Sequence, residues 1–259
     1  MTASLKSHSH GQTMVLTISN PEHRNALGPD MYAAGVEALN AAERSAEVRS
    51  VVITGEGAHF CAGGNLQRLL GNRQLPPEVQ SQSVEGLGNW IEAIHTFPKP
   101  VVAAVEGACA GAGFSLALAC DLIVAAQKSV FAMSYTSVGL SPDGGATWSL
   151  MRAVPRATAL QLLLAGERIS AERLLQLGVI SQVCDDGNAL SEALAVCERL
   201  NARAPNALAS VKELANEAVA APLHTQLNAE REHFVRNLHH PNAGEGIGAF
   251  LEKRPAQYR

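Results

Sequence analysis

The sequence predicts an α/β fold in which layers of helix cover a sheet. Apolar stretches rich in β-branched residues alternate along the chain with stretches whose apolar residues recur at helical spacing. From about residue 157 onward, the chain is rich in helical patterns and poor in strand patterns. Its 259 residues, 47% hydrophobic and 17% charged, are typical of a globular protein that buries a large core.

The N-terminal part predicts two strands with a helix between them. Residues 13–19 (TMVLTIS) and 48–54 (VRSVVIT) are expected to be strands because of their β-branched content. The helix is expected to follow a Gly-Pro-Asp start, because apolar residues recur there at helical spacing: Met31, Ala34, Ala38, Leu39 and Ala42.

The middle of the chain continues the alternation. Residues 101–107 are expected to form a buried strand, residues 112–120 a short helix and residues 121–126 another strand. Residues 72–86 are expected to form a mobile helix or loop. The C-terminal stretch is expected to form a helical subdomain.

Composition and charge exclude several classes of protein. A formal net charge of −4 shows no basic surplus for nucleic acid, and the apolar run 107–120 is too short to span a bilayer. The first ten residues lack the apolar core of a signal peptide, and five cysteines, an odd number mostly in apolar runs, favour reduced thiols. We therefore expect a soluble cytoplasmic protein with no nucleic-acid or membrane partner.

No motif predicts a metal site. The chain contains neither H-E-x-x-H nor C-x-x-C. His8 and His10 form an H-x-H pair, but a mobile N-terminal tail is the preferred interpretation of this segment. We therefore expect no metal.

Two loops of small residues follow predicted strands, at 59–66 (HFCAGGNL) and 106–119 (EGACAGAGFSLALA). Each leaves backbone N–H groups unshielded, and a helix N-terminus adds unsatisfied donors. Two such loops converging on one point would form an oxyanion hole. Tight packing of helix on strand needs the same small residues, and for either loop alone that interpretation is preferred.

A single carboxylate, Asp143, lies in the stretch SPDGGATW (141–148) between Pro142 and two glycines. Proline fixes its own φ, and glycine adopts backbone angles closed to other residues, so this is a specialised turn. An Asp-Gly pair is also a common surface turn. The sequence leaves both a turn-forming and a catalytic role open at this point.

The order of these segments resembles the crotonase superfamily, the enoyl-CoA hydratases and isomerases. Six motifs in sequence carry the resemblance: 20–27 (NPEHRNAL), 60–66 (FCAGGNL), 106–126, 131–154, 166–183 and 250–259 (FLEKRPAQYR). The resemblance covers nearly the whole chain. It implies a spiral core of repeated β-β-α turns and a C-terminal helical trimerisation region, assembled as a homotrimer or as a hexamer built from two trimers.

The resemblance also implies an acyl-CoA site and a division of the chain. Residues 1–195 would form the core with this site, and residues 196–259 the helical region for assembly and for covering CoA. The backbone N–H groups of Gly64 and Ala112 would be the oxyanion donors. Substrate or CoA binding is implied for Arg24, Ala26, Ala62, Gly63, Asn65, Leu66, Gly111, Tyr135, Phe250 and Lys253.

Several of these positions carry a more specific expectation. Ala62 and Leu66 fall where relatives contact the adenine and the pantetheine arm, and Asn65 replaces a usual aspartate but can still cap the following helix. Phe250 and Lys253 would reach the nucleotide bound by a neighbouring subunit.

The two glutamates with which hydratases of this family add water correspond here to Ser115 and Tyr135. Neither side chain is a comparable base at neutral pH. In several isomerases and in a dehalogenase branch, an acidic residue at the place of Asp143 performs the chemistry, and residues 138–148 are especially similar to isomerases of phenylacetate degradation. We therefore expect an enoyl-CoA isomerase that uses Asp143 as proton shuttle.

Other functions stay open. The alternatives are an enoyl-CoA hydratase, a hydrolase of a ring-derived (oxepin-type) acyl-CoA, and a non-catalytic acyl-CoA-binding protein. Residues 113–117 (GFSLA) nearly match the hydrolase motif G-x-S-x-G, but Ser115 is better explained as a helix-start serine, and Cys61 as a small buried residue. No cofactor is expected besides coenzyme A, which is part of the substrate.

Overall fold

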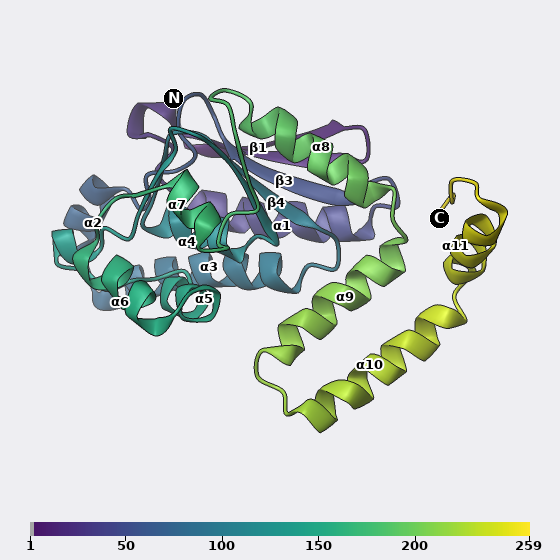
Figure 1. Cartoon of the computed structure of the whole chain (residues 1–259). Coiled ribbons are helices and arrows are strands. Elements are labelled where there is room, and N and C mark those ends of the chain that lie inside the picture. The colour runs from purple at the N-terminus through teal and green to yellow at the C-terminus, as the bar shows by residue number, and fades with distance from the viewer. Residues whose placement is uncertain (1–2) are drawn as a thin grey trace.

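The computed structural model describes residues 3–259 and contains a twisted six-stranded sheet (Figure 1). Its strands lie in the order β1-β2-β3-β4-β6-β9. β1 pairs antiparallel with β2, and the remaining neighbours are parallel. The bounds are β1 Ser4–His10, β2 Thr13–Ser19, β3 Ser50–Gly55, β4 Val101–Val105, β6 Leu122–Ala126 and β9 Gln182–Cys184.

A smaller sheet has the order β5-β7-β8, with bounds Ala108–Ala110, Val130–Ala132 and Ile169–Ser170. An isolated bridge between Cys61 and Cys109 extends it toward the first small-residue loop. Successive turns of the chain thus contribute one strand to each sheet. In one turn β4 joins the large sheet and β5 the small one, and α4 follows; in the next turn β6 and β7 do the same, and α5 follows. This arrangement confirms the predicted spiral of β-β-α turns.

Helices surround the sheets. Those of the core are α1 Pro29–Arg44, α2 Leu66–Asn72, α3 Pro77–Thr96, α4 Ala112–Ala119, α5 Ala146–Ala153, α6 Arg156–Ala165, α7 Ala171–Gln176 and α8 Ala189–Asn201. The C-terminal helices are α9 Pro205–Ala218, α10 Leu223–Leu238 and α11 Pro241–Glu252. Short 3-10 helices, η1 and η2, span Pro21–His23 and Thr136–Val138. No helix among residues 3–259 is long and apolar enough to cross a membrane.

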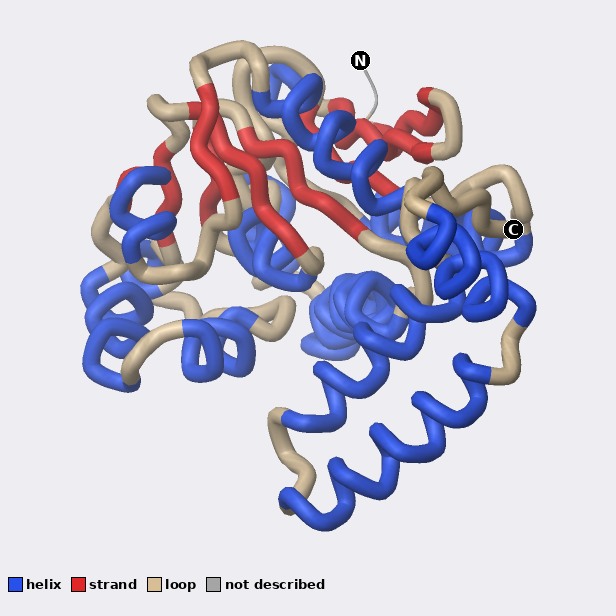
Figure 2. Tube along the Cα trace, turned by 45° about the vertical axis from the view of Figure 1, so that its right-hand side comes forward, coloured by secondary structure: helices blue, strands red, loops and turns tan. Residues whose placement is uncertain are grey.

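The central strands of the large sheet are buried on both faces, and successive side chains of a strand point to opposite sides. On β3, Val52 packs with Ala193 and Cys197 of α8, whereas Val51 and Ile53 join the larger core formed with α1, α3 and α4. Figure 2 shows the strands as a layer with α8 running across one face. Burial on both faces explains why these strands are continuous apolar runs.

The predicted strands and helices of the first half are confirmed. Three further segments differ from, or refine, what the sequence predicts. The N-terminal segment is strand β1 rather than a mobile tail, because all seven of its residues pair with β2. The short strands β8 and β9 lie in the region expected to be helical. Within residues 72–86, helix α3 begins at Pro77.

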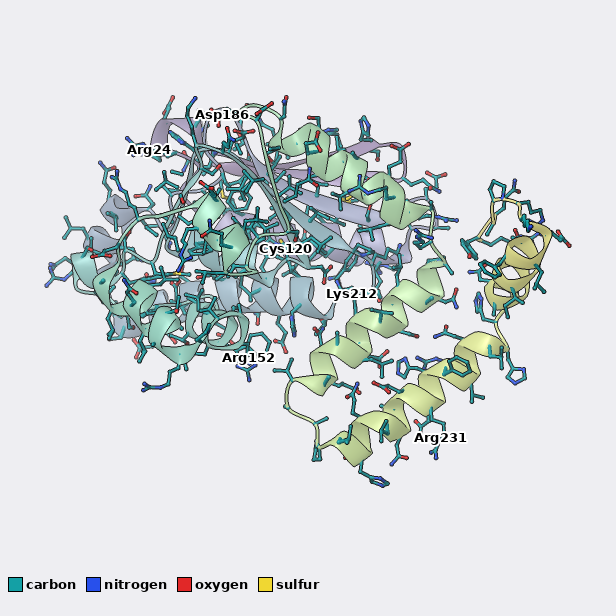
Figure 3. All side chains as sticks on the ribbon, viewed as in Figure 1. Arg24, Cys120, Arg152, Asp186, Lys212 and Arg231 are labelled. Carbon is teal, nitrogen blue, oxygen red and sulfur yellow. The ribbon has the colours of Figure 1, made fainter. Side chains whose placement is uncertain are left out.

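The C-terminal helices extend away from the core and are tied to it by polar contacts (Figures 1 and 3). Lys212 on α9 donates to the Asp121 carboxylate at 2.7 Å and to the Lys99 carbonyl at 3.0 Å. Asn216 donates to the His95 carbonyl at 2.9 Å. The division of the chain into a core (1–195) and a C-terminal helical region (196–259) stays a prediction. Helix α8 runs across this boundary and packs on the large sheet.

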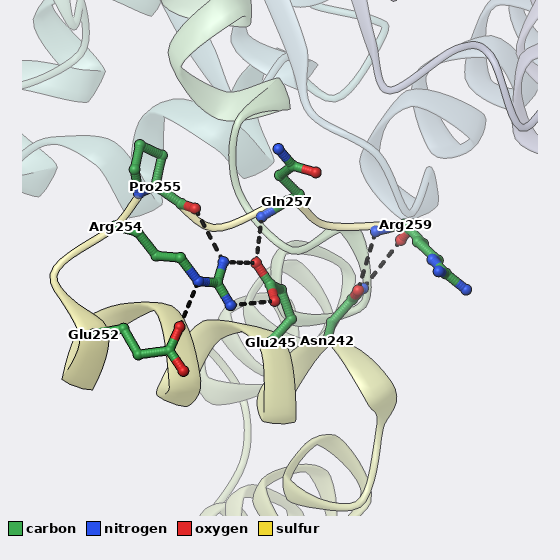
Figure 4. A network of polar contacts seen from close by, with 7 residues as sticks. All are labelled: Asn242, Glu245, Glu252, Arg254, Pro255, Gln257 and Arg259. Atoms are coloured by element: carbon green, nitrogen blue, oxygen red, sulfur yellow. Dashed lines mark hydrogen bonds and ion pairs between the residues drawn. The ribbon is translucent and has the colours of Figure 1, made fainter.

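The chain end folds back onto α11 (Figure 4). Arg254 makes two hydrogen bonds with Glu245, at 2.7 and 3.0 Å, and a third with Glu252 at 2.7 Å. Asn242 exchanges hydrogen bonds with the backbone of Arg259 at 3.0 and 3.1 Å. The last residues are therefore held as one unit with α11.

Candidate active site

The first small-residue loop (59–66) is held by the N-terminal motif 20–27. Asn25, whose φ of 59° lies in the left-handed region that asparagine tolerates, donates to the carbonyls of Glu56 and His59 at 2.9 and 2.6 Å. The Arg24 carbonyl accepts from the Ala62 N–H at 2.9 Å. The motif thus fixes the course of the loop through its backbone.

The two small-residue loops lie side by side. The backbone N–H of Cys61 donates to the Ala108 carbonyl at 3.0 Å, and the Cys61 carbonyl accepts from the Ala110 N–H at 2.9 Å. At Gly63, whose φ is 100°, a Cβ would lie 2.9 Å from the Ala110 oxygen and 3.5 Å from the Ala112 nitrogen. Only glycine allows this approach, which brings the first loop against the start of α4.

The predicted oxyanion donors lie where these loops meet. Among the described residues, neither the Gly64 N–H nor the Ala112 N–H donates a hydrogen bond to another protein group. Ala112 is the first residue of α4, where N–H groups have no intrahelical partner and the helix dipole is positive. The preceding Gly111 N–H is bonded to the Ala132 carbonyl at 2.9 Å. Two free donors therefore remain for a ligand oxygen.

Asp143 sits on a turn that packs tightly against α3 and α4. A Cβ added at Gly144, where φ is 56°, would lie 3.0 Å from Ser115 Cβ and 3.2 Å from Leu87 Cδ2. The Asp143 carbonyl accepts from the Ser115 hydroxyl at 3.0 Å and from the Ala146 N–H at 3.2 Å, at the start of α5. The Pro-Asp-Gly-Gly sequence thus forms a turn that packs directly on α4. A residue larger than glycine at position 144 would crowd Ser115 and displace the turn from this helix.

Three polar side chains meet at this turn. The Tyr135 hydroxyl donates to Asp143 Oδ1 at 2.7 Å and lies 3.3 Å from the Ser115 hydroxyl. Gly111 lies beside them, because a Cβ there would be 3.9 Å from the Tyr135 hydroxyl and 3.9 Å from Gly63 Cα. The carboxylate, the tyrosine and the two loops therefore belong to one site.

Burial dominates the electrostatics of the site. It raises the pKa of Asp143 above the usual carboxyl range, while the Tyr135 hydrogen bond opposes that shift by stabilising the carboxylate. Burial and the nearby Asp143 charge raise the pKa of Tyr135, which stays a neutral donor. Burial also raises the pKa of Cys61 to about 12, so this residue is a thiol and no nucleophile.

The remaining predicted positions divide into those near the first small-residue loop and α2 and those on α11. Asn65 caps α2 through a 3.0 Å bond to the Arg68 N–H, Ala26 is buried, and Leu66 is exposed at the start of α2. Arg24 lies on the surface (Figure 3). Phe250, 82% exposed on α11, lies far from α2 across the molecule (Figure 1).

Lys253, at the end of α11, also stays away from the site within one chain. The segment after α11 meets the amino end of β3, where Arg49 donates to the Tyr258 carbonyl at 2.7 Å. The small-residue loops follow the opposite, carboxyl ends of the strands. Phe250 and Lys253 are therefore not brought to Asp143 by this chain.

One group of residues was not predicted from the sequence: Arg68 on α2, Tyr32 on α1 and Ser83 on α3. Arg68 donates to Ser83 at 3.0 Å, and burial raises the pKa of Tyr32, while the Arg68 charge lowers it and the Asp143 charge raises it. An arginine three residues after a helix cap has the pattern of a surface residue, so only the packing of three helices reveals it. Among residues 3–259, no group of three or more His, Cys, Asp and Glu side chains could hold a metal.

Comparisons with known proteins agree with this architecture. A model of the enoyl-CoA hydratase/isomerase family matches residues 9–259. The 1,2-epoxyphenylacetyl-CoA isomerase of Escherichia coli K12 is 36% identical over 253 residues, covering 97% of both chains. A probable enoyl-CoA hydratase of Rhodobacter capsulatus is 37% identical, covering 94% of this chain and 93% of the relative.

Solved structures give the same result. A crystal structure of an enoyl-CoA hydratase from Polaromonas sp. JS666 matches with a TM-score of 0.98 and 68% identity, covering 99% of this chain and all of the other. A Geobacillus kaustophilus structure described as an enoyl-CoA hydratase subunit matches with a TM-score of 0.92 and 31% identity, covering 98% of this chain and 97% of the other. The chain therefore belongs to the enoyl-CoA hydratase/isomerase family and is an enzyme of the crotonase superfamily.

Proposed function

We propose that this enzyme is an enoyl-CoA isomerase in which Asp143 is the only proton-transfer carboxylate. The observation that carries the proposal is the hydrogen-bonded group of Ser115, Tyr135 and Asp143, in which a single side chain is acidic. The resemblance assigns the catalytic glutamates of hydratases to positions 115 and 135. Here both positions hold neutral hydroxyls that orient Asp143.

The reaction requires one base and one oxyanion site. The thioester oxygen would bind between the N–H groups of Gly64 and Ala112, which stabilise the negative charge that develops on it. Asp143 removes a proton from one carbon of the acyl chain, an enolate forms, and the same carboxyl returns the proton to another carbon. Because Oδ1 accepts the Tyr135 hydrogen bond, Oδ2 is the oxygen that takes up the proton.

Addition of water requires more catalytic groups than isomerisation. A water must be held and deprotonated while carbon receives a proton, and a pair of carboxylates divides these tasks. Isomerisation only shifts a proton within the substrate, so one carboxylate suffices. The name of the Escherichia coli relative, an isomerase of an epoxide-bearing acyl-CoA, supports this class of reaction and its extension to ring opening.

Coenzyme A is proposed to bind as part of the substrate, with no additional cofactor. Leu66 lies at the start of α2 and Ala62 in the loop before it, on either side of the Gly64 donor, where the adenine and the pantetheine arm would be contacted. Arg24, exposed on the neighbouring loop, would face the CoA phosphates. The five free cysteines are compatible with the cytoplasmic location that we propose.

We propose assembly into a trimer, or into a hexamer built from two trimers, through the C-terminal helices. α10 exposes large apolar side chains along its length, with exposed fractions of 74% at Leu223, 53% at Leu227 and 69% at Phe234. Such a contiguous apolar surface favours burial against a second copy. Phe250 and Lys253, remote from their own site, would then reach the site of a neighbour, and light scattering at micromolar concentration tests this assembly.

The reaction itself is tested by offering the wild-type enzyme a panel of 3-enoyl-CoA and 2-enoyl-CoA thioesters and weighing the products by mass spectrometry. Isomerisation leaves the mass unchanged and converts the 3-enoyl into the conjugated 2-enoyl form. Hydration gives an acyl-CoA that is one water heavier. Hydrolysis of the thioester gives the free acid and CoA, and hydrolysis of a ring gives a ring-opened acyl-CoA that is one water heavier. The conjugated 2-enoyl product, of the same mass as the 3-enoyl substrate, is expected. Water addition as the main reaction would contradict the proposal in favour of a hydratase.

A further inference from the structure

Arg68 is an inward-facing cation on an otherwise exposed helix. Its neighbours on α2, Leu66 and Leu70, are 58% and 64% exposed, and α2 contains no fully buried residue. The guanidinium of Arg68 turns toward α3, where its Nη1 donates to the buried Ser83 hydroxyl at 3.0 Å. Its Nε is buried without any hydrogen-bond partner.

The partners of this guanidinium are neutral. Tyr32 is buried on α1, and this burial raises the pKa of Tyr32 to about 12, although Arg68 lies close enough for its charge to lower that pKa, so the phenol carries no charge at neutral pH. The ion pairs of residues 3–259 include none with Arg68. Arginine stays charged in proteins. A partly buried positive charge thus lacks a counter-ion, which is an unfavourable arrangement unless an anion arrives.

This cation lies beside the acyl part of the proposed site. Leu69, its neighbour on α2, is 3.5 Å from the position of a Cβ at Gly64, the first oxyanion donor. Tyr32 lies in the electrostatic field of both Arg68 and Asp143. Arg68 precedes Leu69 on the same helix, so a group a few carbons beyond the thioester would come close to Arg68.

The geometry points to a carboxylate subsite: we propose that Arg68, with Tyr32 and Ser83, binds a carboxylate at the far end of the acyl chain. The preferred substrates would then be CoA monothioesters of dicarboxylic acids. A carboxylate supplies the missing counter-charge to the partly exposed guanidinium, in a charge-assisted bond that guanidinium geometry favours. A purely hydrocarbon acyl chain would leave the charge unpaired. This inference rests on the proposed acyl-CoA site.

The test compares two saturated, unreactive ligands that differ in one carboxylate. Hexanoyl-CoA and adipyl-CoA are titrated by calorimetry into the wild-type enzyme. Hydrogen bonds to charged groups predict that adipyl-CoA binds about ten- to a hundredfold more tightly. In Arg68→Met the preference should disappear while hexanoyl-CoA binds as before, and Arg68→Lys should keep part of it. Arg73→Met, at the exposed end of α2, is the matched control and should keep all of it.

The outcomes separate this inference from the proposed function. Equal binding of both ligands by the wild-type enzyme would overturn the carboxylate subsite but leave the acyl-CoA site intact. A preference for adipyl-CoA that persists in Arg68→Met would also overturn it, because another group would then supply the charge. Failure of both ligands to bind would overturn the acyl-CoA site itself and the subsite with it. The wild-type comparison holds whether or not the Arg68 variants fold.

Discussion

The Tyr135 hydroxyl donates a 2.7 Å hydrogen bond to Oδ1 of Asp143, and the proposed isomerase mechanism rests on this pair. A tyrosine that donates to Oδ1 leaves Oδ2 as the other oxygen of this carboxylate, which the proposed mechanism uses as the base. Ser115 completes the arrangement by donating to the Asp143 backbone carbonyl at 3.0 Å. In the proposed mechanism, the two positions that the resemblance assigns to the carboxylates of hydratases orient a third side chain, Asp143.

Replacing Tyr135 by phenylalanine should move the pH profile of turnover. Burial raises the pKa of Asp143, and the Tyr135 hydrogen bond counteracts part of that shift. Without the bond the pKa rises further, and because the base acts when deprotonated, the acidic limb of kcat should move to higher pH. Turnover measured from acidic to alkaline pH checks this. An unshifted limb would mean that Tyr135 does not act on Asp143.

Replacing Ala112 by proline should remove one oxyanion donor while keeping α4. Ala112 is the first residue of the helix, a position at which proline is tolerated because its N–H would have no intrahelical partner. Loss of one donor from an oxyanion hole lowers kcat by about 10²–10³-fold. Ala112→Gly keeps the N–H and should stay close to wild-type turnover. Similar rates for the two variants would refute the donor role of Ala112.

Replacing Lys212 by methionine should loosen the attachment of α9 to the core. The Asp121 side chain is partly buried, with 29% of its surface exposed, and this burial raises its pKa although Lys212 opposes the shift. Removing the lysine leaves this carboxyl without its counter-charge, at a cost of roughly 1–3 kcal/mol in the free energy of unfolding. Urea unfolding measures this loss. Lys128→Met, which breaks the exposed pair with Asp186, is the control and should change stability little.

The core strands and the two small-residue loops could be predicted from the sequence because each leaves a local signal. β2, β3 and β4 are buried on both faces and are therefore continuous apolar runs. Pro142 and Gly144 mark the specialised turn that holds Asp143. The resemblance supplied the spiral and the pairing of the loops, which no local pattern contains.

Other features depend on contacts between distant segments. β1 is polar and mostly exposed, and only its pairing along β2 makes it a strand. β5 has three residues, too few for a periodic pattern. The group of Arg68, Tyr32 and Ser83 comes from three separate helices, and the Tyr135–Asp143 hydrogen bond depends on how η2 and the following turn pack on α4.

The most direct measurement is kcat of Asp143→Asn on the best 3-enoyl-CoA substrate of the panel. Asparagine keeps the volume of the side chain and an oxygen that can accept from Tyr135, but it cannot take up the proton. The account predicts a fall in kcat of about 10²–10⁴-fold, with substrate affinity nearly unchanged because the donors of Gly64 and Ala112 are backbone groups. Turnover near the wild-type level would contradict it and show that Asp143 only forms the turn.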